Sequence, residues 1–424
     1  MKVLKDGGHH LFSPDENVAR LVRETLADVR ENGMDAVRKI SRERDDWDPP
    51  SFELTPEQIR EAGEQLPESV RQDINFCQAQ VRGFAQKQLE AMKPLEVETL
   101  PGVVLGHKHL PIRRVGCWVP GGRYPLVASA YMSIITAKVA GVDSVVAATP
   151  PVKGKGWIPA TIYAMHTSGA DRIFCVGGVR ALAMMAYGIG GIEPVDMLAG
   201  PGGSFIIEAK RQLFGQCGID LIAGPSEILI IADESADPSL VACDLLGQAE
   251  HDPDAGLCLI TTSLSLGEAV SSEIERQLET LPTREVASVS WADNGIILVA
   301  EDDDEAIRLS DDYAPEHLEL HVAKRDYYFN KLRIYGSLFI GEETTVAYGD
   351  KTIGTNHILP TGRAARYTGG LWVGNFLRTC TYQYMTPQAS RKLAEINERV
   401  CNLEGMLAHA RTAHVRRERY AQEN

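Results

Sequence analysis

The sequence lacks several features that would place a protein in a class at once. No apolar run approaches the roughly 20 residues that span a bilayer, and the first residues do not form a secretory signal. The eight cysteines include no Cys-x-x-Cys pair, and Cys175 and Cys258 stand in apolar, strand-like stretches. Such thiols are typical of reduced core residues, so a cytoplasmic location is expected.

Positive charge is also scarce. The chain has 43 Lys and Arg residues against 58 Asp and Glu residues, which gives a net charge of −15. This balance argues against a nucleic-acid-binding surface. The basic run between Arg411 and Arg417 is a local exception and is most simply the solvated end of a helix. With 424 residues, 44% of them hydrophobic, the chain is long enough to form more than one core.

A dinucleotide-binding fingerprint is missing as well. No Gly-x-Gly-x-x-Gly follows an expected strand, and the glycine runs at Gly122 and Gly203 are loose signals, typical of plain turns. After a charged, helical stretch of about 100 residues, however, strand-like and helix-like patterns alternate. Such alternation predicts an α/β fold with parallel sheets of the doubly wound type. The expected strands cover residues 114–119, 144–149, 172–176, 228–232, 256–261, 295–299 and 336–340.

One expected helix ends in an amide and an imidazole. Apolar residues between Leu240 and Leu246 recur at helical spacing, so Gln248 and His251 share one face of that helix. A breaker cluster at residues 252–256 ends the helix, which puts His251 at its mouth, where imidazole can reach a metal. A lone histidine on a helix is also common as a capping or surface residue, and both interpretations stay open.

A carboxylate and an imidazole stand next to each other at Glu316 and His317. Pro315 fixes the chain just before them, and the alternating Leu318 and Leu320 that follow indicate a half-buried strand. Adjacent side chains of an extended segment point to opposite faces, so we expect each group to have its own partner. The alternative is an exposed turn with two solvated polar groups.

Two further segments offer ligand groups. Asp350 stands in an expected glycine-rich loop, where the backbone can approach a ligand closely, and its carboxylate suits a metal ion. Glu404 and His409 stand near the end of an expected C-terminal helix. Because Glu404 and His409 are five positions apart, their side chains point about 140° apart around a helix axis. They reach one site only if the end of the helix lies across that site.

Together these segments make the chain similar to the histidinol dehydrogenase family over essentially its whole length. The resemblance rests on blocks at residues 119–122, 125–126, 200–202, 208–211, 223–227, 231–233, 248–251, 315–317, 354–357 and 408–409. It implies two incomplete Rossmann-like parallel-sheet domains, at residues 106–235 and 236–378. A helical N-terminal region at 1–105 would pack partly on the second domain, and residues 379–424 would form a C-terminal helical dimerisation tail.

The resemblance also implies a zinc-dependent, NAD+-linked dehydrogenase. One zinc ion per subunit would be held by Gln248, His251, Asp350 and His409. Glu316 and His317 would be the acid/base pair, and the substrate would be lined by His317, Ser226 and Glu404. Family members are homodimers whose C-terminal segment reaches the partner's site, so Glu404 and His409 would come from the other subunit.

These residue types suit that chemistry. Zinc held by imidazole, carboxylate and amide groups keeps room for substrate oxygens. A neutral His317 near its ordinary pKa of about 6.5 would take the hydroxyl proton, and Glu316 would polarise the water that hydrates an aldehyde. A primary alcohol would then be oxidised through a bound aldehyde to a carboxylate, with two NAD+ consumed and the reactive aldehyde retained.

The chain departs from the family pattern in its cofactor region. Gly203 replaces a usual Asn, Arg180 replaces a common Gln, and Trp118 matches a position that is usually Tyr. The resemblance implies contact of this region with NAD+. For Trp118, a role as a core aromatic at a strand end is the alternative.

A larger departure covers residues 363–378, which resemble the branch that oxidises 2,3-dihydroxypropane-1-sulfonate to sulfolactate. That substrate is an anion, whereas histidinol is a cation. A guanidinium offers sulfonate oxygens charge-assisted, forked hydrogen bonds, so Arg366, beside Tyr367 and Trp372, is expected to meet the anionic end. A surface salt bridge is the alternative for Arg366. Glu404 suits the cationic histidinol better, which stays the second substrate interpretation.

Two other classes of protein stay open. A zinc hydrolase would use the same ligands, with Glu316 activating water for amide or ester cleavage, and NADH formation from an alcohol would separate the two. A non-catalytic metabolite-binding homologue has no use for both Glu316 and His317, whose presence favours chemistry. No membrane or nucleic-acid partner is expected.

Overall fold

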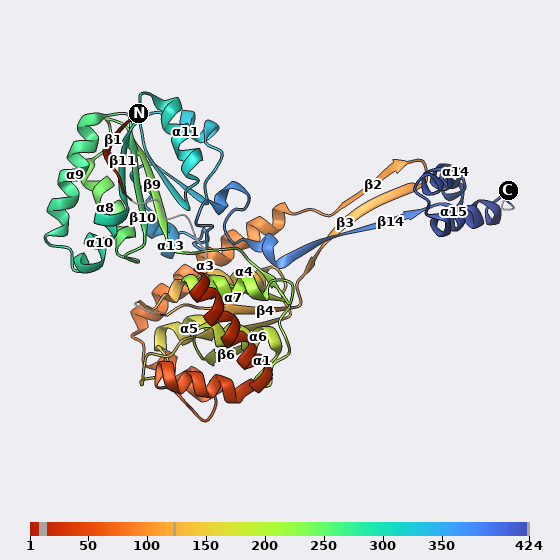
Figure 1. The fold of residues 1–424 in the computed structure, drawn as a ribbon, viewed down its shortest axis with the longest axis horizontal. Helices are drawn as coiled ribbons and strands as arrows, with labels where there is room; N and C mark the ends of the chain where they lie inside the picture. Colours follow the sequence, from red (N-terminus) through yellow and green to blue (C-terminus); the bar gives the residue numbers. More distant parts are fainter. Residues whose placement is uncertain (8–14, 122–123, 422–424) are drawn as a thin grey trace. The chain divides into compact units, whose positions relative to one another are not determined.

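The computed structural model describes residues 1–7, 15–121 and 124–421, so the glycine signal at Gly122 lies outside the described part. The chain forms two compact units (Figure 1). The first contains residues 1–87 and 112–376, and the second contains residues 88–111 and 377–424. Among the described residues, no helix combines the length and apolar character that crossing a membrane requires.

The first sheet of the larger unit consists of parallel strands in the order β6-β5-β4-β7-β8. These are β4 (Arg114–Trp118), β5 (Ser144–Thr149), β6 (Arg172–Cys175), β7 (Met197–Ala199) and β8 (Gly218–Ile219). Helices α4 (Val127–Val139) and α5 (Pro159–Ser168) pack against each other, and α5 also packs against α2 (Pro56–Glu64). Helix α1 (Glu16–Asp45) packs against α6 (Gly178–Tyr187) and α7 (Ser204–Leu213), so the N-terminal helix belongs to the core of this sheet.

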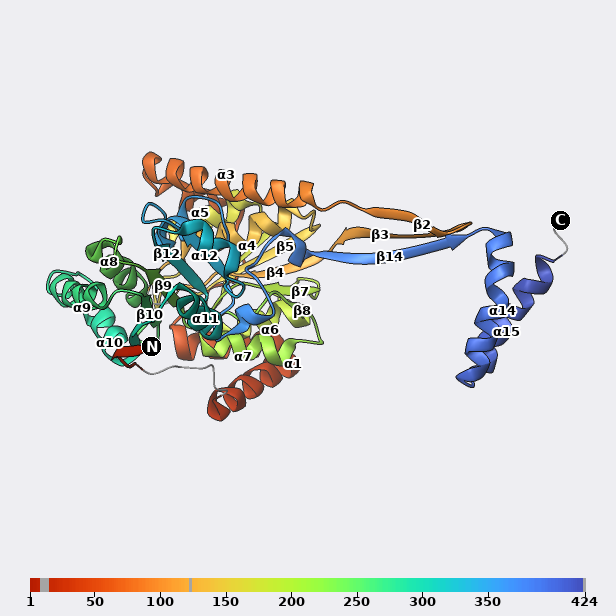
Figure 2. The same ribbon diagram turned by 90° about the horizontal axis from the view of Figure 1, so that it is seen from above.

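The second sheet has the strand order β1-β11-β10-β9-β12-β13, and every pairing is parallel except that of β1 with β11. Its strands are β1 (Lys2–Lys5), β9 (Glu227–Ala232), β10 (Gly256–Thr261), β11 (Gly295–Val299), β12 (His317–His321) and β13 (Ser337–Ile340). Helices α8 (Pro238–Ala249), α9 (Leu264–Leu278) and α10 (Arg284–Asn294) cover one face, and α11 (Asp303–Tyr313) and α12 (Arg325–Lys331) cover the other (Figure 2).

The apolar run of β9 follows from this double cover. Ile228 and Ile230 join the core beneath α8 to α10, whereas Leu229 and Ile231 join the core beneath α11 and α12. Successive side chains of a strand point to opposite faces, so a strand buried on both faces reads as a continuous hydrophobic stretch. β9 lies between β10 and β12 and is therefore a central strand of the sheet.

The second unit has an antiparallel sheet in the order β14-β3-β2 and two helices. Its elements are β2 (Leu95–Leu100), β3 (Val103–Pro111), β14 (Leu377–Met385), α14 (Pro387–Leu403) and α15 (Leu407–Arg419). Helices α14 and α15 pack against each other, and the hydroxyl of Thr386 accepts the Ala389 N–H at the start of α14. Helix α3 (Glu68–Ala91) continues from the first unit into the residues of the second.

The expected α/β class with parallel sheets is confirmed, whereas the expected boundaries differ from the structure. A boundary at residue 235 puts β9 in the first domain, but β9 pairs with β10 and β12 of the second sheet. The N-terminal β1 also joins the second sheet, and β3 pairs with β14 of the expected helical tail. Periodicity reports the type of an element and its buried face but not its distant hydrogen-bonding partners.

A buried ion pair fixes the loop after β7. The Lys210 ammonium contacts Asp220 and donates hydrogen bonds to the carbonyls of Gly200 (3.0 Å) and Leu221 (2.7 Å), while Asp220 accepts the Gly200 N–H at 2.7 Å. Both side chains are almost fully buried, at 3% and 0% exposed. The pair therefore ties α7 to the glycine-containing segment that follows β7.

We expect Lys210→Met to lower the free energy of unfolding by about 3–5 kcal/mol, because it leaves the Asp220 carboxylate buried without its cation. The double variant Lys210→Met/Asp220→Asn should recover part of that loss. Urea denaturation followed by circular dichroism measures both, with the exposed Lys153→Met as the control. Equal stability of the Lys210→Met and Lys153→Met proteins would contradict the assignment.

Candidate active site

A cavity of about 440 Å³ opens between the two sheets of the larger unit. Segments after β4 and β7, at the carboxyl ends of the first sheet, form one wall with Pro120, Pro201 and Gly203. The amino ends of β9 and β12, with α8 and α13 (Val346–Lys351), supply the other. The polar side chains that line it are Tyr124, Ser129, Ser204, Ser226, His251, Asp252, Asp254, Glu316, His317, Asp350, Lys351 and His357.

Glu316 is held at the start of β12 by the start of β9. One of its carboxylate oxygens, Oε2, accepts hydrogen bonds from the Ser226 hydroxyl and the Glu227 N–H, both at 2.8 Å. Ala314, at φ 58, ends α11 in the left-handed region, and Pro315 follows it, so the backbone before Glu316 is restricted. The carboxylate is 6% exposed, and its two hydrogen bonds fix its direction.

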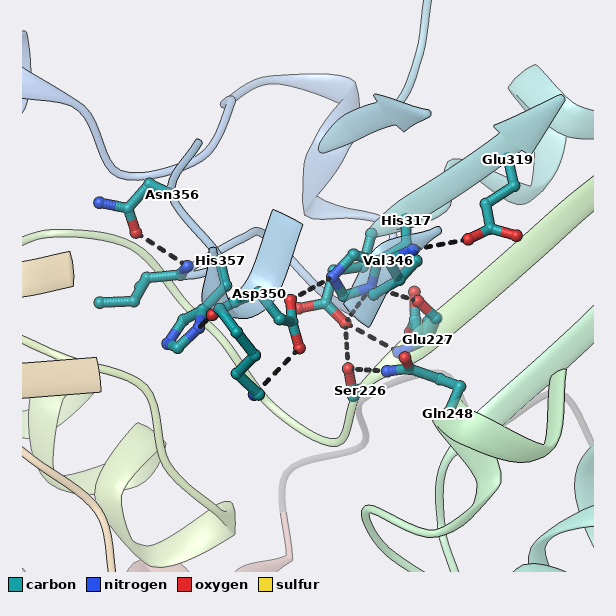
Figure 3. A network of polar contacts seen from close by, with 12 residues as sticks. Ser226, Glu227, Gln248, His317, Glu319, Val346, Asp350, Asn356 and His357 are labelled. Carbon is teal, nitrogen blue, oxygen red and sulfur yellow. Dashed lines mark hydrogen bonds and ion pairs between the residues drawn. The ribbon is translucent and has the colours of Figure 1, made fainter. Parts of the chain in front are cut away.

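His317 turns its two ring nitrogens to different partners. Its Nδ1 lies 2.8 Å from the Glu227 carbonyl, so Nδ1 carries a proton and donates it there. Its Nε2 is buried, has no hydrogen-bond partner among the described residues, and lies 3.7 Å from Asp350 Oδ1. The nitrogen able to accept a proton therefore faces Asp350 (Figure 3).

Glu316 and His317 have the separate partners that were expected, and they also contact each other. Their Oε2 and Nδ1 atoms are 3.4 Å apart, because Glu316 precedes β12 and does not follow the alternation of the strand. Burial would lower the pKa of His317, but the charge of Glu316 and the contact with Asp350 outweigh burial and hold that pKa well above its usual value. The expectation of an ordinary pKa near 6.5 is therefore wrong for the protein alone.

The predicted helix before His251 is confirmed as α8, whose last turn carries Gln248. The Gln248 amide nitrogen donates to the Ser226 hydroxyl, which leaves the amide oxygen for another ligand. His251 follows the helix and lines the cavity. Burial lowers the pKa of His251, which favours the neutral imidazole that a metal ion requires.

Asp350 lies in the last residues of the short helix α13 and not in the expected loop, because residues 346–351 complete a helical turn before the glycine at 354. Lys351 Nζ lies 3.5 Å from its Oδ2. Burial would raise the pKa of Asp350, but the contact with His317 and the charges of His357 and Lys351 hold it well below its usual range. The carboxylate is therefore ionised, as a metal ligand must be.

The donor set in the cavity fits a zinc ion. An amide oxygen at Gln248, a neutral imidazole at His251 and an ionised carboxylate at Asp350 are groups that zinc and similar ions bind. The buried and unpartnered Nε2 of His317 lies beside Asp350, as expected where a ligand or substrate is to be received. Three of the four predicted ligands thus belong to the larger unit.

The other two predicted residues lie in the second unit. Glu404 ends α14, and His409 lies on α15; both side chains are exposed within that unit. His409 as the fourth ligand and Glu404 as a substrate contact stay predictions.

The predicted cofactor residues differ in their surroundings. Gly203 precedes α7 and lines the cavity, with open space where a Cβ would stand. Trp118 is 5% exposed at the end of β4. Arg180 is 4% exposed, donates to Ser41 Oγ at 3.0 Å and pairs with Asp45, so its guanidinium joins α6 to α1. The contacts of these residues with NAD+ stay predictions.

The predicted anion contact, Arg366, is exposed, and its Nε donates to the Arg363 carbonyl at 3.0 Å. Arg363 is less exposed than Arg366. Its backbone has φ 66, and its Nε is buried without a hydrogen-bond partner among the described residues. The two residues before it bind the cavity wall, since Thr361 Oγ1 accepts the Gly224 N–H at 2.6 Å and Gly362 N–H donates to Glu227 Oε1 at 2.9 Å.

Sequence reasoning missed two polar side chains of the site. His357 is half-buried, with Nδ1 3.0 Å from the Asp350 carbonyl and Nε2 2.9 Å from Ser129 Oγ, so it links α13 to the first sheet's α4. Glu227 is half-buried as well, and desolvation followed by the charge of Glu316 raises its pKa to about 7. Both residues stand in the blocks at 223–227 and 354–357, which was the available signal.

Comparison with known proteins agrees with this site. Residues 12–417 match the family described as Histidinol dehydrogenase. A histidinol dehydrogenase homolog of Shouchella clausii is 53% identical, covering 95% of each chain. A sulfopropanediol 3-dehydrogenase of Ruegeria pomeroyi is 43% identical, covering 96% of this chain and 94% of its own.

The fold agrees with a solved structure as well. The histidinol dehydrogenase of Elizabethkingia anophelis superposes with a TM-score of 0.92 at 29% identity, covering 97% of this chain and 94% of its own. Sequence and fold therefore agree over nearly the whole length. The chain belongs to the histidinol dehydrogenase family of NAD-dependent oxidoreductases.

Proposed function

We propose that the protein is a zinc-dependent, NAD+-linked dehydrogenase that oxidises a primary alcohol through a bound aldehyde to a carboxylate. The substrate proposed is 2,3-dihydroxypropane-1-sulfonate, and the product is 3-sulfolactate. The observation that carries the reaction type is the buried Glu316–His317 pair with the unpartnered Nε2 of His317 beside Asp350. A buried acid/base pair at a cavity is typical of proton transfer.

His317 acts first as the base. Its Nδ1–H is held by the Glu227 carbonyl, so Nε2 is the atom that accepts the proton of the substrate hydroxyl. A divalent ion on Gln248, His251 and Asp350 would polarise that hydroxyl and would offset the charge of Asp350, which is one of the charges that raise the pKa of His317. NAD+ accepts the hydride from the alcohol carbon.

Glu316 acts in the second oxidation. The aldehyde must add water before a second hydride can leave, and Glu316 takes the proton from that water. Its carboxylate already accepts two hydrogen bonds on Oε2, which leaves Oε1 as the atom that faces a substrate. A second NAD+ accepts the second hydride, and four electrons in total leave the alcohol carbon. Retention of the aldehyde in the cavity between the two stages is part of this proposal.

The second unit supports a proposed homodimer. Glu404 and His409 are exposed within their own unit, and so are apolar side chains around them, such as Leu403 and Leu407 at 88% and 68% exposed. Exposed apolar side chains in such number are typical of an interface. We propose that a partner subunit covers them and that Glu404 and His409 complete the partner's site in a cytoplasmic homodimer.

The proposed sulfonate substrate rests on the 43% identical sulfopropanediol 3-dehydrogenase and on the cationic segment that contains Arg363 and Arg366. An arginine side chain suits a sulfonate better than an ammonium group. L-Histidinol is the second candidate, because Glu404 offers a carboxylate that matches a cationic substrate.

Replacing either acid/base residue should stop turnover without removing the metal. We expect Glu316→Gln and His317→Asn to lower NADH formation at least about 100-fold, since a positioned acid or base contributes about 10²–10⁴-fold. Zinc content, measured by mass spectrometry, should match that of the wild type. The exposed Glu234→Gln is the matched control and should keep full activity. Wild-type rates of NADH formation in either variant would exclude the mechanism.

The anionic end of the substrate gives a second prediction. Arg366→Gln should lower kcat/KM for 2,3-dihydroxypropane-1-sulfonate by about 10–100-fold, because a hydrogen bond to a charged group contributes about 1.5–3 kcal/mol. Oxidation of an uncharged diol should change little. The exposed Arg333→Gln serves as the control. Turnover of histidinol and not of the sulfonate by the wild type would overturn the proposed substrate, and an equal loss on both diols would remove Arg366 from anion recognition.

A further inference from the structure

A second cluster of metal-binding side chains lies apart from the predicted zinc ligands. Asp244 on α8 and Glu319 and His321 on β12 bring one ligand atom each within 4.8 Å of one another. Among the described residues, these are the three His, Cys, Asp or Glu side chains whose ligand atoms lie close enough together to share a metal ion. None of its members was among the predicted site residues.

In the cluster, each carboxylate has one oxygen held by another part of the chain and directs its second oxygen at His321. Glu319 Oε1 accepts the Val346 N–H at 2.7 Å (Figure 3), and Asp244 Oδ1 accepts the Thr345 hydroxyl at 2.8 Å. The other oxygens, Glu319 Oε2 and Asp244 Oδ2, both face His321 Nε2. Hydrogen bonds that hold the outer atoms of ligating side chains are typical of metal sites.

The charges of the cluster do not balance. The side chains of Glu319 and His321 are 0% and 1% exposed, and that of Asp244 is 14% exposed. No Lys or Arg forms an ion pair with either carboxylate in the part of the chain that the structure describes. Even a protonated His321 would leave one negative charge in excess, and a buried unpaired charge is costly.

The distances suit a shared cation better than hydrogen bonds. His321 Nε2 lies 3.4 Å from Glu319 Oε2 and 3.7 Å from Asp244 Oδ2, whereas a normal N–H···O bond is about 2.7–3.2 Å. Two ligands of a tetrahedral zinc ion, each about 2.0–2.1 Å from it, stand about 3.3–3.4 Å apart. In addition, His321 Nδ1 is buried without a hydrogen-bond partner among the described residues. No protein contact at Nδ1 therefore fixes which ring nitrogen carries the proton.

We propose that Asp244, Glu319 and His321 bind a second divalent cation, with zinc favoured by the one imidazole and two carboxylates. The same donor set accepts Mn²⁺ or Co²⁺, and metal loading will decide among them. The site is distinct from the one predicted on Gln248, His251 and Asp350.

The position of this site gives it a role in holding the cavity wall. On α8, Asp244 stands one turn before Gln248, and on α13, Val346 stands one turn before Asp350. On β12, Glu319 and His321 share a face with His317. A cation at the cluster therefore fixes the three elements that carry the candidate active site, and its ligands are positioning residues.

Metal content after dialysis and reloading with Zn²⁺ tests the proposal on the full-length protein. Wild type should retain two zinc ions per chain by mass spectrometry, and Asp244→Asn and His321→Gln should each retain one. His251→Asn should also lose one ion while keeping the ion of the cluster, and His251→Asn/Asp244→Asn should retain none. The exposed Asp293→Asn on α10 is the matched control and should retain two.

The same series separates this proposal from the proposed function. One zinc per wild-type chain that Asp244→Asn keeps and His251→Asn loses would overturn the second site. One zinc that only the cluster variants lose would support the second site and exclude the catalytic zinc. If the cluster variants fail to fold, two other measurements test the proposal: the number of zinc ions per wild-type chain and the rise in Tm of His251→Asn on adding zinc. Absence of that rise would contradict the proposal.

Discussion

The contacts between the beginnings of β9 and β12 determine the geometry of the whole candidate site. The segment Ser226–Glu227 gives a hydroxyl and an N–H to the Glu316 carboxylate, and its carbonyl accepts the proton of His317. Glu316 and His317 are thus positioned by the same two residues, through hydrogen bonds in a buried setting where such bonds are strong. The parallel pairing of β9 with β12 maintains this arrangement, because it fixes His317 opposite Ile228.

The two sheets contribute different groups to the cavity. The carboxyl ends of the first sheet supply small, glycine-containing segments, and in open α/β sheets that end is where ligands bind. The second sheet supplies charged side chains from the amino ends of its strands, together with α8 and α13. The charged side chains and the glycine-containing segments of the cavity therefore come from separate sheets.

Much of the fold was predictable from local pattern. The alternation of strands and helices, the helix α8 and the strand after Pro315 are confirmed, because each leaves a periodic or breaker signal in its own segment. The predicted helix extended through His251, whereas α8 ends at Ala249. The assignment of β9, β1 and β3 to their sheets was not predictable, since strand partners lie far apart in sequence. Asp350 was expected in a loop, because a helix as short as α13 leaves too few residues for a periodic signal.

The site was predictable only in part, for a similar reason. Gln248, His251, Glu316 and His317 stand in short motifs, whereas the surroundings that set the pKa values of His251 and His317 come from other segments. The carboxylates of Glu316 and Asp350 raise the pKa of His317, and sequence alone does not give that juxtaposition. The cluster of Asp244, Glu319 and His321 was missed because Glu319 and His321 alternate with apolar residues in β12 and read there as an ordinary strand face.

The backbone at Arg363 has a consequence for how this region can change. Glycine adopts a φ of 66 without strain, whereas a residue with a Cβ destabilises the folded state by roughly 1–2 kcal/mol at this position. Its neighbours Thr361 and Gly362 are anchored to the cavity wall, so the chain has little freedom to relax. A glycine at this position would make the fold more stable and the surroundings of the cavity less cationic. At Arg363, thermal stability and the attraction of the cavity for anions therefore favour different residues.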